Sequence, residues 1–256
     1  MNEIERFAQE VAANVKGLAA DRDVQALSRI WVREITRHKY TYNFSWLGRP
    51  IIQTPQDMIA MQEIIWRTRP DLIIETGVAH GGSLIYYASL LELMGGDGVV
   101  LGIDIDIRAH NRAEIEKHPM AKRIRLFQGS SVDAPAVAEA RKHVAGGKRV
   151  MVVLDSNHTH EHVLKELELY APFVTKDCYL VVFDTLLDDM PDDLVQNRPW
   201  GQGNNPKTAV HEFLKRGDRF AIDKDIEHKL LITVAPDGYL KQSAVANEII
   251  RLARGL

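Results

Sequence analysis

The sequence predicts an α/β protein with a doubly wound, mostly parallel sheet and an N-terminal helical extension. After Pro70, short apolar runs alternate with helical patterns at intervals of roughly 25–30 residues. Strands separated by helices form βαβ units, whose parallel strands are covered on both faces. The expected strands are Leu72–Thr76, Val99–Asp104, Ile124–Gln128, Val150–Asp155 and Tyr179–Asp184.

The N-terminal part has a different rhythm. Apolar residues recur every three or four positions from Ile4 to Leu18, and a second amphipathic stretch runs from Asp23 to about His38. Residues 40–55 are rich in aromatics, Gly and Pro and are expected to form a loop or arm. Thr54 suits an N-cap and Pro55 a first helical position, which predicts a helix over Pro55–Thr68.

The chain is therefore expected to divide into N-terminal helices with an aromatic arm (1–55) and a main domain (56–256). Helices are predicted between the strands at Ser83–Met94, Arg108–Lys117, Ala134–Val144 and His160–Ala171. The C-terminal part is expected to add a helix over Pro206–Arg216, strands over Arg219–Ile222 and Lys229–Val234, a turn at Pro236–Gly238 and a helix over Ser243–Leu252.

Composition excludes several classes of protein. The 256 residues carry a net charge of −3, so no broad basic field for nucleic acid is expected. The longest apolar runs are far too short to cross a bilayer. The N-terminus is acidic where a secretion signal would be basic and then apolar. A single cysteine, Cys178, excludes an intramolecular disulfide, and the predicted location is the cytoplasm.

Acidic residues end four of the five predicted strands: Glu75, Asp104, Asp155 and Asp184. Parallel α/β sheets bind ligands at the carboxyl ends of their strands, where the topology changes direction. The third strand instead ends in a turn, Gly129 to Ser131. These strand ends are the predicted site.

The first strand runs into ETGVAHGGS, residues 75–83. Gly77 and Gly81 permit a tight turn and a close approach to a ligand, and the next helix offers free N–H groups. The segment lacks the dinucleotide pattern GxGxxG, since Ala79 stands where a second glycine is required, and it lacks a P-loop. Glu75 suits a cationic ligand. The alternative is a turn that needs glycine for geometry alone.

Asp104 is placed to accept hydrogen bonds from the hydroxyl groups of a ribose, while Asp106 is expected to cap the following helix. Ser130 and Ser131 are candidates for contacts with an adenine edge, and a helix cap is an equal alternative.

Asp155 and Asp184 end neighbouring parallel strands and offer hard oxygen ligands suited to Mg²⁺. His158, three residues beyond Asp155, is a candidate base for a substrate hydroxyl. A zinc or iron site formed with His160 and His162 is the alternative, although HExxH spacing is absent. The acidic residues of segment 188–193 are expected in an exposed loop that could close over the metal. Trp46 and Trp200 offer faces for a sugar ring or for packing.

Taken together, these residues resemble a class I S-adenosylmethionine-dependent methyltransferase, and more narrowly the cephalosporin hydroxylase/rhamnosyl O-methyltransferase family. The resemblance runs roughly from Tyr42 to Lys241. It rests on NFSWLGRPIIQTPQD (43–57), ETGVAHGGS (75–83), GIDIDIRAHNR (102–112), HPM (118–120), QGSSVD (128–133), LDSNHTHEHV (154–163), VVFDT (181–185), RPWGQGNNPKTAV (198–210) and KLLITVAPDGYLK (229–241).

The resemblance implies cofactor contacts from Glu75, Gly77, Ala79, Gly81, Ser83, Asp104, Ser130, Ser131 and Asp155. It also implies Mg²⁺ held by Asp155 and Asp184, with His158 as the base. Magnesium-dependent members carry another acidic ligand just before Asp184, where this chain has Phe183. Thr185, an acid of segment 188–193 or water would then complete the metal shell, or metal binding would be weak.

The function predicted from these residues is Mg²⁺-assisted transfer of a methyl group from S-adenosylmethionine to a hydroxyl of a sugar or a glycosylated natural product, by a homo-oligomer. Two alternatives stay open. One is a hydroxylating component, for which the sequence lacks an HxD motif. The other is a non-catalytic accessory protein that keeps the cofactor cleft, for which Phe183 is the best indication.

Overall fold

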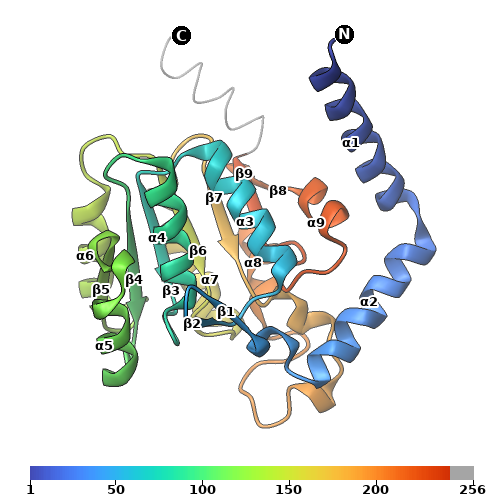
Figure 1. The fold of residues 1–256 in the computed structure, drawn as a ribbon. Helices are drawn as coiled ribbons and strands as arrows, with labels where there is room; N and C mark the ends of the chain where they lie inside the picture. The colour runs from blue at the N-terminus through green and yellow to red at the C-terminus, as the bar shows by residue number, and fades with distance from the viewer. Residues whose placement is uncertain (243–256) are drawn as a thin grey trace.

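The computed structural model describes residues 1–242 and confirms the predicted fold class. A seven-stranded sheet has the order β5-β4-β3-β6-β7-β9-β8 (Figure 1). Its first five strands in this order are parallel, and β9 is antiparallel to both of its neighbours. The strands are β3 (Leu72–Thr76), β4 (Val99–Asp104), β5 (Ile124–Gln128), β6 (Val150–Leu154), β7 (Tyr179–Val182), β8 (Phe220–Ile222) and β9 (Tyr239–Gln242).

Helices cover both faces of the sheet, which explains why its central strands are continuous apolar runs. Every residue of β3 and β6 is buried. In the view of Figure 1, α3 and α4 lie in front of the sheet and α7 and α8 behind it. The helices of this part are α3 (Pro55–Thr68), α4 (Gly82–Met94), α5 (Ala109–Lys117), α6 (Ala134–Val144), α7 (His160–Tyr170), α8 (Pro206–Lys215) and α9 (Lys224–Leu230).

The order of the strands places the topological switch between β3 and β6. From β3 the chain builds β4 and β5 on one side of the sheet and then returns to form β6 on the other. The ends of β3, β4, β6 and β7 therefore bring Glu75, Asp104, Asp155 and Asp184 to one rim of the sheet. Short 3₁₀ helices complete the connections: Pro119–Arg123, Ala171–Phe173, Thr185–Asp189 and Asp192–Leu194.

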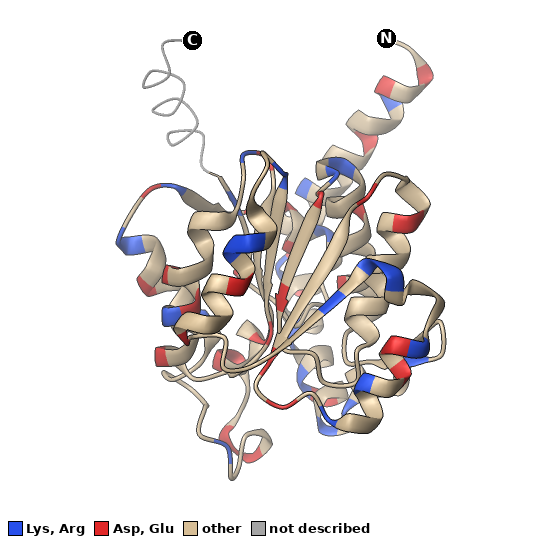
Figure 2. Ribbon diagram, turned by 90° about the vertical axis from the view of Figure 1, so that its left-hand side faces the viewer, with Lys and Arg blue, Asp and Glu red and all other residues tan. Residues whose placement is uncertain are grey.

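The N-terminal extension forms two helices, as expected: α1 (Glu3–Ala20) and α2 (Arg22–Arg37). Figure 1 shows α1 projecting beyond the body of the molecule. Ile4 and Phe7 are 82% and 66% exposed. No described helix is both long and apolar enough to cross a membrane. Figure 2 shows Lys and Arg positions interspersed with Asp and Glu positions along the helices.

The loop expected over residues 40–55 is corrected to a 3₁₀ turn (Tyr40–Asn43) and a two-stranded hairpin, β1 (Phe44–Trp46) and β2 (Arg49–Ile51). The hairpin turns at Leu47 and Gly48, which both have positive φ. It packs so tightly on α4 that a Cβ on Gly82 would lie 2.1 Å from the carbonyl oxygen of Pro50. The domain boundary at residue 55 stays a prediction.

The strand predicted over Lys229–Val234 is wrong. Lys229 lies in α9, and the residues after this helix bond to Asp57, a fully buried carboxylate of α3, instead of to a neighbouring strand. The hydroxyl of Thr233 and the backbone N–H of Val234 both donate to it. The turn at Pro236–Gly238 is confirmed, and it leads into β9. The helix predicted over Ser243–Leu252 lies outside the described residues.

Candidate active site

Two cavities meet at the rim of the sheet. The inner cavity, about 210 Å³, is lined by the loop after β3, the strand ends of β4 and β6, and residues 50–53 of the hairpin and the segment after it. The outer cavity, about 330 Å³, lies between the end of α2, the segment 184–200 and residues 232–234. Tyr42, His158 and Asp184 line both cavities.

The loop after β3 is held against two strand ends. Gly77 has φ +95°, and a Cβ there would lie 2.0 Å from the carbonyl oxygen of Asp155. Asp104 accepts hydrogen bonds from the backbone N–H groups of Val78 (2.7 Å) and Ala79 (3.3 Å). Asp104 therefore both lines the inner cavity and fixes the loop.

The predicted cap by Asp106 is wrong. The N-cap of α5 is Arg108, which makes no side-chain cap bond. Asp106 is exposed, and its carboxylate lies 3.8 Å from the Arg108 guanidinium. Its backbone N–H donates to Asp104 instead, because the chain turns back at the end of β4.

Two buried oxygen atoms beside the inner cavity have no partner among the described residues. Glu75 accepts a hydrogen bond from Ser83 on one carboxylate oxygen, and its other oxygen is unpaired. The buried amide of Gln53, which lines the cavity, also has an unpaired oxygen. Burial, with a smaller contribution from the charge of Asp104, raises the pKa of Glu75 to about 8. Such acceptors fit a ligand that carries a positive charge or N–H donors.

The predicted cofactor residues divide into two groups. Gly77, Ala79, Ser83, Asp104 and Asp155 line the inner cavity. Glu75, Gly81, Ser130 and Ser131 do not belong to its described lining, and Glu75 is fully buried. A Cβ on Gly81 would meet Ile115 of α5. The hydroxyl of Ser131 lies 3.1 Å from Nε2 of His162, and its carbonyl accepts from Tyr170. Their cofactor roles stay predictions.

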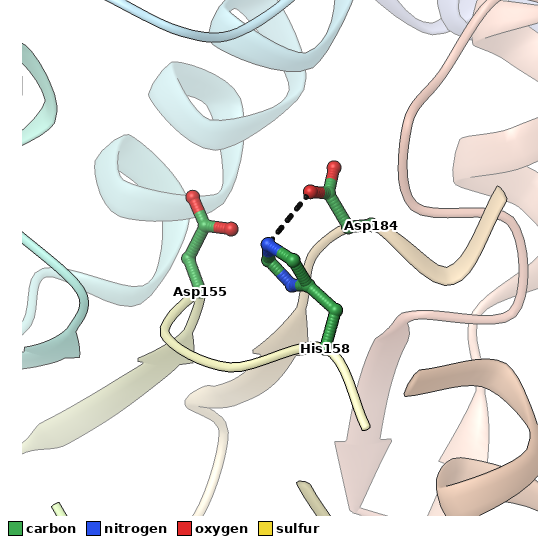
Figure 3. Close-up of side chains that lie close together, drawn as sticks. All are labelled: Asp155, His158 and Asp184. Atoms are coloured by element: carbon green, nitrogen blue, oxygen red, sulfur yellow. Dashed lines mark ion pairs between the residues drawn. The ribbon is translucent and has the colours of Figure 1, made fainter. Parts of the chain in front are cut away.

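Asp155, His158 and Asp184 come together where the two cavities meet (Figure 3). Nε2 of His158 lies 3.2 Å from Oδ2 of Asp184. One ligand atom from each residue lies within 4.8 Å of the others, and within residues 1–242 this is the one group of three or more such side chains close enough to hold a metal ion. Burial and the nearby charge of Asp184 raise the pKa of Asp155 well above its usual range. A bound cation would remove this repulsion.

The residues that flank Asp184 point to other partners. Phe183 is buried and packs edge-on against Tyr239. Thr185 is buried as well, and its hydroxyl donates to the carbonyl of Pro236 at 2.5 Å. Thr185 as a metal ligand stays a prediction.

Hydrogen bonds and ion pairs with other segments fix three carboxylates of the acidic segment 188–193. Asp188 accepts from the backbone of Gly203 and the amide of Asn205, and Asp189 pairs with Lys207. Asp193 pairs with Arg37 at the end of α2. These contacts hold the wall of the outer cavity, and none of these acids belongs to the metal-binding group.

The site with three histidines is not formed by the described residues. Nδ1 of His160 lies 2.8 Å from the hydroxyl of Thr208. His162 faces Ser131, Ser156 and Glu166 from inside α7. Only His158, which precedes this helix, reaches the two aspartates.

The two tryptophans have different roles. Trp46 donates to Ser89 and packs edge-on against Tyr86, so it belongs to the packing of the hairpin on α4. Trp200 lines the outer cavity, with its ring edge-on to His158 at 4.8 Å. The opposite walls are apolar and include Val32, Ile35, Leu186, Leu187, Val195 and Ile232.

Sequence reasoning missed several site residues. Gln53, Tyr42 and His80 line the inner cavity, and Lys39 and Arg198 line the outer one. The guanidinium of Arg49 donates to the carbonyl of His80, so the hairpin is hydrogen-bonded to the loop after β3. Pro50 and Pro55 flank the segment IIQT (51–54) and were the available sequence signal for a connection that contains Gln53. No local sequence pattern marks Lys39 or Arg198.

The raised pKa of the buried Glu75 predicts that replacing this residue changes stability by an amount that depends on pH. Its folded pKa of about 8 lies above its ordinary value of 4.5, so the unfolded state ionises first and folding becomes less favourable as pH rises from 4.5 to 8. Glu75→Gln keeps an acceptor for Ser83 without this cost. We expect the variant to exceed the original protein in free energy of unfolding by about 4 kcal/mol at pH 8, with almost no difference at pH 4.5.

Urea unfolding at both pH values measures this difference. The exposed Glu63→Gln on α3, which pairs with Lys229, is the matched control and should show no pH-dependent difference. Parallel stability profiles for the original protein and Glu75→Gln would contradict the raised pKa.

Comparison with known proteins identifies the family. The model of the Rhamnosyl O-methyltransferase/CmcI family matches residues 38–243. Rhamnosyl O-methyltransferase of Mycobacterium tuberculosis is 31% identical over 218 residues, covering 79% of this chain and 82% of the relative. The enzyme of the same name from Mycobacterium leprae is 32% identical over 213 residues, covering 79% of this chain and 87% of its own.

Solved structures share the fold. An apo structure of CmcI superposes with a TM-score of 0.56 at 19% identity, covering 79% of this chain and 77% of that one. An O-methyltransferase from Bacillus cereus in complex with SAH gives a TM-score of 0.52 at 12% identity, covering 76% and 81%. Sequence match and fold agree, and the chain belongs to the Rhamnosyl O-methyltransferase/CmcI family.

Proposed function

We propose that this protein is an S-adenosylmethionine-dependent O-methyltransferase that methylates a hydroxyl of a sugar or glycosylated compound with the help of Mg²⁺. The observation that carries the proposal is the meeting of two cavities at His158 and Asp184, which allows one ligand to lie on each side. The names of the relatives support a sugar acceptor. A structure of CmcI with Mg and SAM supports the pair of cofactors.

The inner cavity fits the cofactor. The unpaired oxygens of Glu75 and Gln53 suit the positively charged methionine part, and Asp104 has lone pairs left for ribose hydroxyls. Gly77 and Ala79 bring backbone close to the ligand without side-chain bulk. When bound, S-adenosylmethionine supplies an electrophilic methyl group on a sulfonium.

The acceptor hydroxyl would be prepared by the residues at the junction. Asp155 and Asp184 would hold Mg²⁺, which when bound lowers the pKa of a coordinated hydroxyl. His158 would take the proton that the acceptor oxygen loses as that oxygen bonds to the methyl group, while the methyl–sulfur bond breaks and S-adenosylhomocysteine leaves with the electron pair. Asp184 lies within 3.2 Å of the imidazole and orients it. Apolar side chains of the outer cavity would cover part of an acceptor bound there and reduce its contact with water, which would strengthen the electrostatic contributions.

A homo-oligomeric assembly and a cytoplasmic location are also part of the proposal. Exposed apolar side chains along α1 and α2, among them Phe7, Leu27 and Trp31, support contact with a second copy. The free, buried Cys178 is compatible with a reducing compartment.

Asp104 tests the cofactor assignment. Calorimetry should show S-adenosylmethionine and S-adenosylhomocysteine binding with micromolar affinity and NAD giving no heat. Asp104→Ala should weaken the binding at least tenfold, because two ribose hydroxyls and the loop amides lose their acceptor. Asp106→Ala, an exposed carboxylate two residues on, is the control and should bind normally. Binding of NAD instead would end the methyltransferase proposal.

Asp184 tests the metal assignment. Asn tolerates the left-handed backbone at this position, where φ is +56°, so Asp184→Asn removes the charge with little strain. We expect Mg²⁺ to raise the melting temperature of the original protein and to have little effect on the variant. Asp189→Asn, whose carboxylate pairs with Lys207, should behave like the original protein. An equal response in Asp184→Asn would place the metal elsewhere.

His158 tests the base. His158→Ala should reduce turnover by about 10²–10⁴-fold while its affinity for S-adenosylhomocysteine stays within a factor of two or so. His160→Ala, an imidazole bound to Thr208 outside both cavities, is the control. Full activity of His158→Ala would require another base. Absence of turnover in the original protein with every sugar acceptor offered would favour the accessory alternative.

A further inference from the structure

Two cations of the outer cavity lack a carboxylate partner within residues 1–242. Lys39 and Arg198 both line this cavity, and neither takes part in any of its ion pairs or side-chain hydrogen bonds. The contact that Arg198 makes is with Trp200, whose ring centre lies 5.4 Å from the guanidinium carbon. A cation placed over an aromatic face in a cavity wall stays available for an anion on its other side.

The neighbouring cations behave differently. Arg37, two residues before Lys39, lies 2.6 Å from Asp193, and Lys207 lies 2.6 Å from Asp189. Asp189 and Asp193 lie in the segment that forms this wall but outside the lining, and they pair with cations that are also outside the lining. Lys39 and Arg198 are left as the unpaired positive charges of the lining, and its one carboxylate is Asp184.

The charges of the cavity are separated along its depth. Asp184 and His158 lie at the inner end, half-buried, whereas Lys39 and Arg198 are exposed. Apolar side chains of α2 and of segment 186–195 lie among these polar groups in the lining. A molecule that presents a hydroxyl to His158 would leave its remainder near the two cations.

We propose that the acceptor is a sugar that carries an anionic group, a phosphate or a carboxylate, which Lys39 and Arg198 bind while the hydroxyl to be methylated reaches His158. This proposal rests on the methyltransferase function of the same site. Arg offers a planar fork for two oxygens and Lys a mobile point charge, and both suit phosphate and carboxylate. A neutral glycoside would leave both cations without a partner.

The test uses the full chain loaded with S-adenosylhomocysteine and calorimetry with matched trios of sugars. Each trio contains a methyl hexoside, the same hexose as a 1-phosphate and the corresponding uronate, which separates neutral, phosphate and carboxylate acceptors. We expect an anionic member of a trio to bind at least tenfold more tightly than its neutral counterpart. Titrations with and without Mg²⁺ separate binding by the cations from direct coordination to the metal.

Variants then test whether Lys39 and Arg198 bind the anionic group of the sugar. Lys39→Gln and Arg198→Gln should each reduce the affinity for the anionic sugar about tenfold and leave the neutral sugar unchanged, while Arg198→Lys should retain part of it. Arg33→Gln removes the same charge from a cation of α2 that pairs with Glu34 outside the cavity lining, and it should have no effect. The proposal is overturned if no anionic sugar binds more tightly than its neutral match, or if the variants bind it normally. Binding of S-adenosylhomocysteine, measured first, tests the methyltransferase function separately.

Discussion

The close contact between Gly77 and the end of β6 is the constraint on which the site depends. With a carbonyl oxygen 2.0 Å from where a Cβ would stand, no other residue fits this position without moving the strand ends apart. The contact brings the loop after β3 and Asp155 together, so both line the inner cavity. The switch in strand order at β3 and β6 makes this possible, because the chain leaves the sheet in opposite directions there.

The same closeness concentrates negative charge. Burial raises the pKa of Glu75 and that of Asp155. The charge of Asp104 adds to the effect on Glu75, and the charges of Asp184 and Glu75 add to the effect on Asp155. An arrangement of this kind lowers the stability of the protein without ligands, and the positive charges of a sulfonium and a divalent cation would offset that loss. The pattern of unfavourable pKa shifts therefore supports the proposed ligands independently of the family name.

Much of the fold could be predicted from periodicity alone. The central parallel strands are marked by apolar runs, because a strand covered on both faces must be apolar throughout, while the edge strand β5 keeps the exposed Arg125 and Gln128. Prediction failed where a single distant group decides the local structure. The run that ends at Val234 is apolar enough for a strand, but Asp57, far away in sequence, captures Thr233 and Val234. The hairpin at residues 44–51 was missed because its strands are only three residues long.

The sequence predicted the acidic residues at the strand ends but not the residues that line the rest of the two cavities. Asp104, Asp155, His158 and Asp184 follow directly from strand ends, since the topology alone brings them together. Lys39, Gln53 and Arg198 come from three separate connections, and only the packing of α2 and the hairpin against the domain assembles them. The topology of the sheet positions the acidic rim, whereas the connections supply the residues of the walls. A family member can therefore keep the methyl-transfer centre while the charges around the acceptor change, and the acceptor must be inferred from the walls.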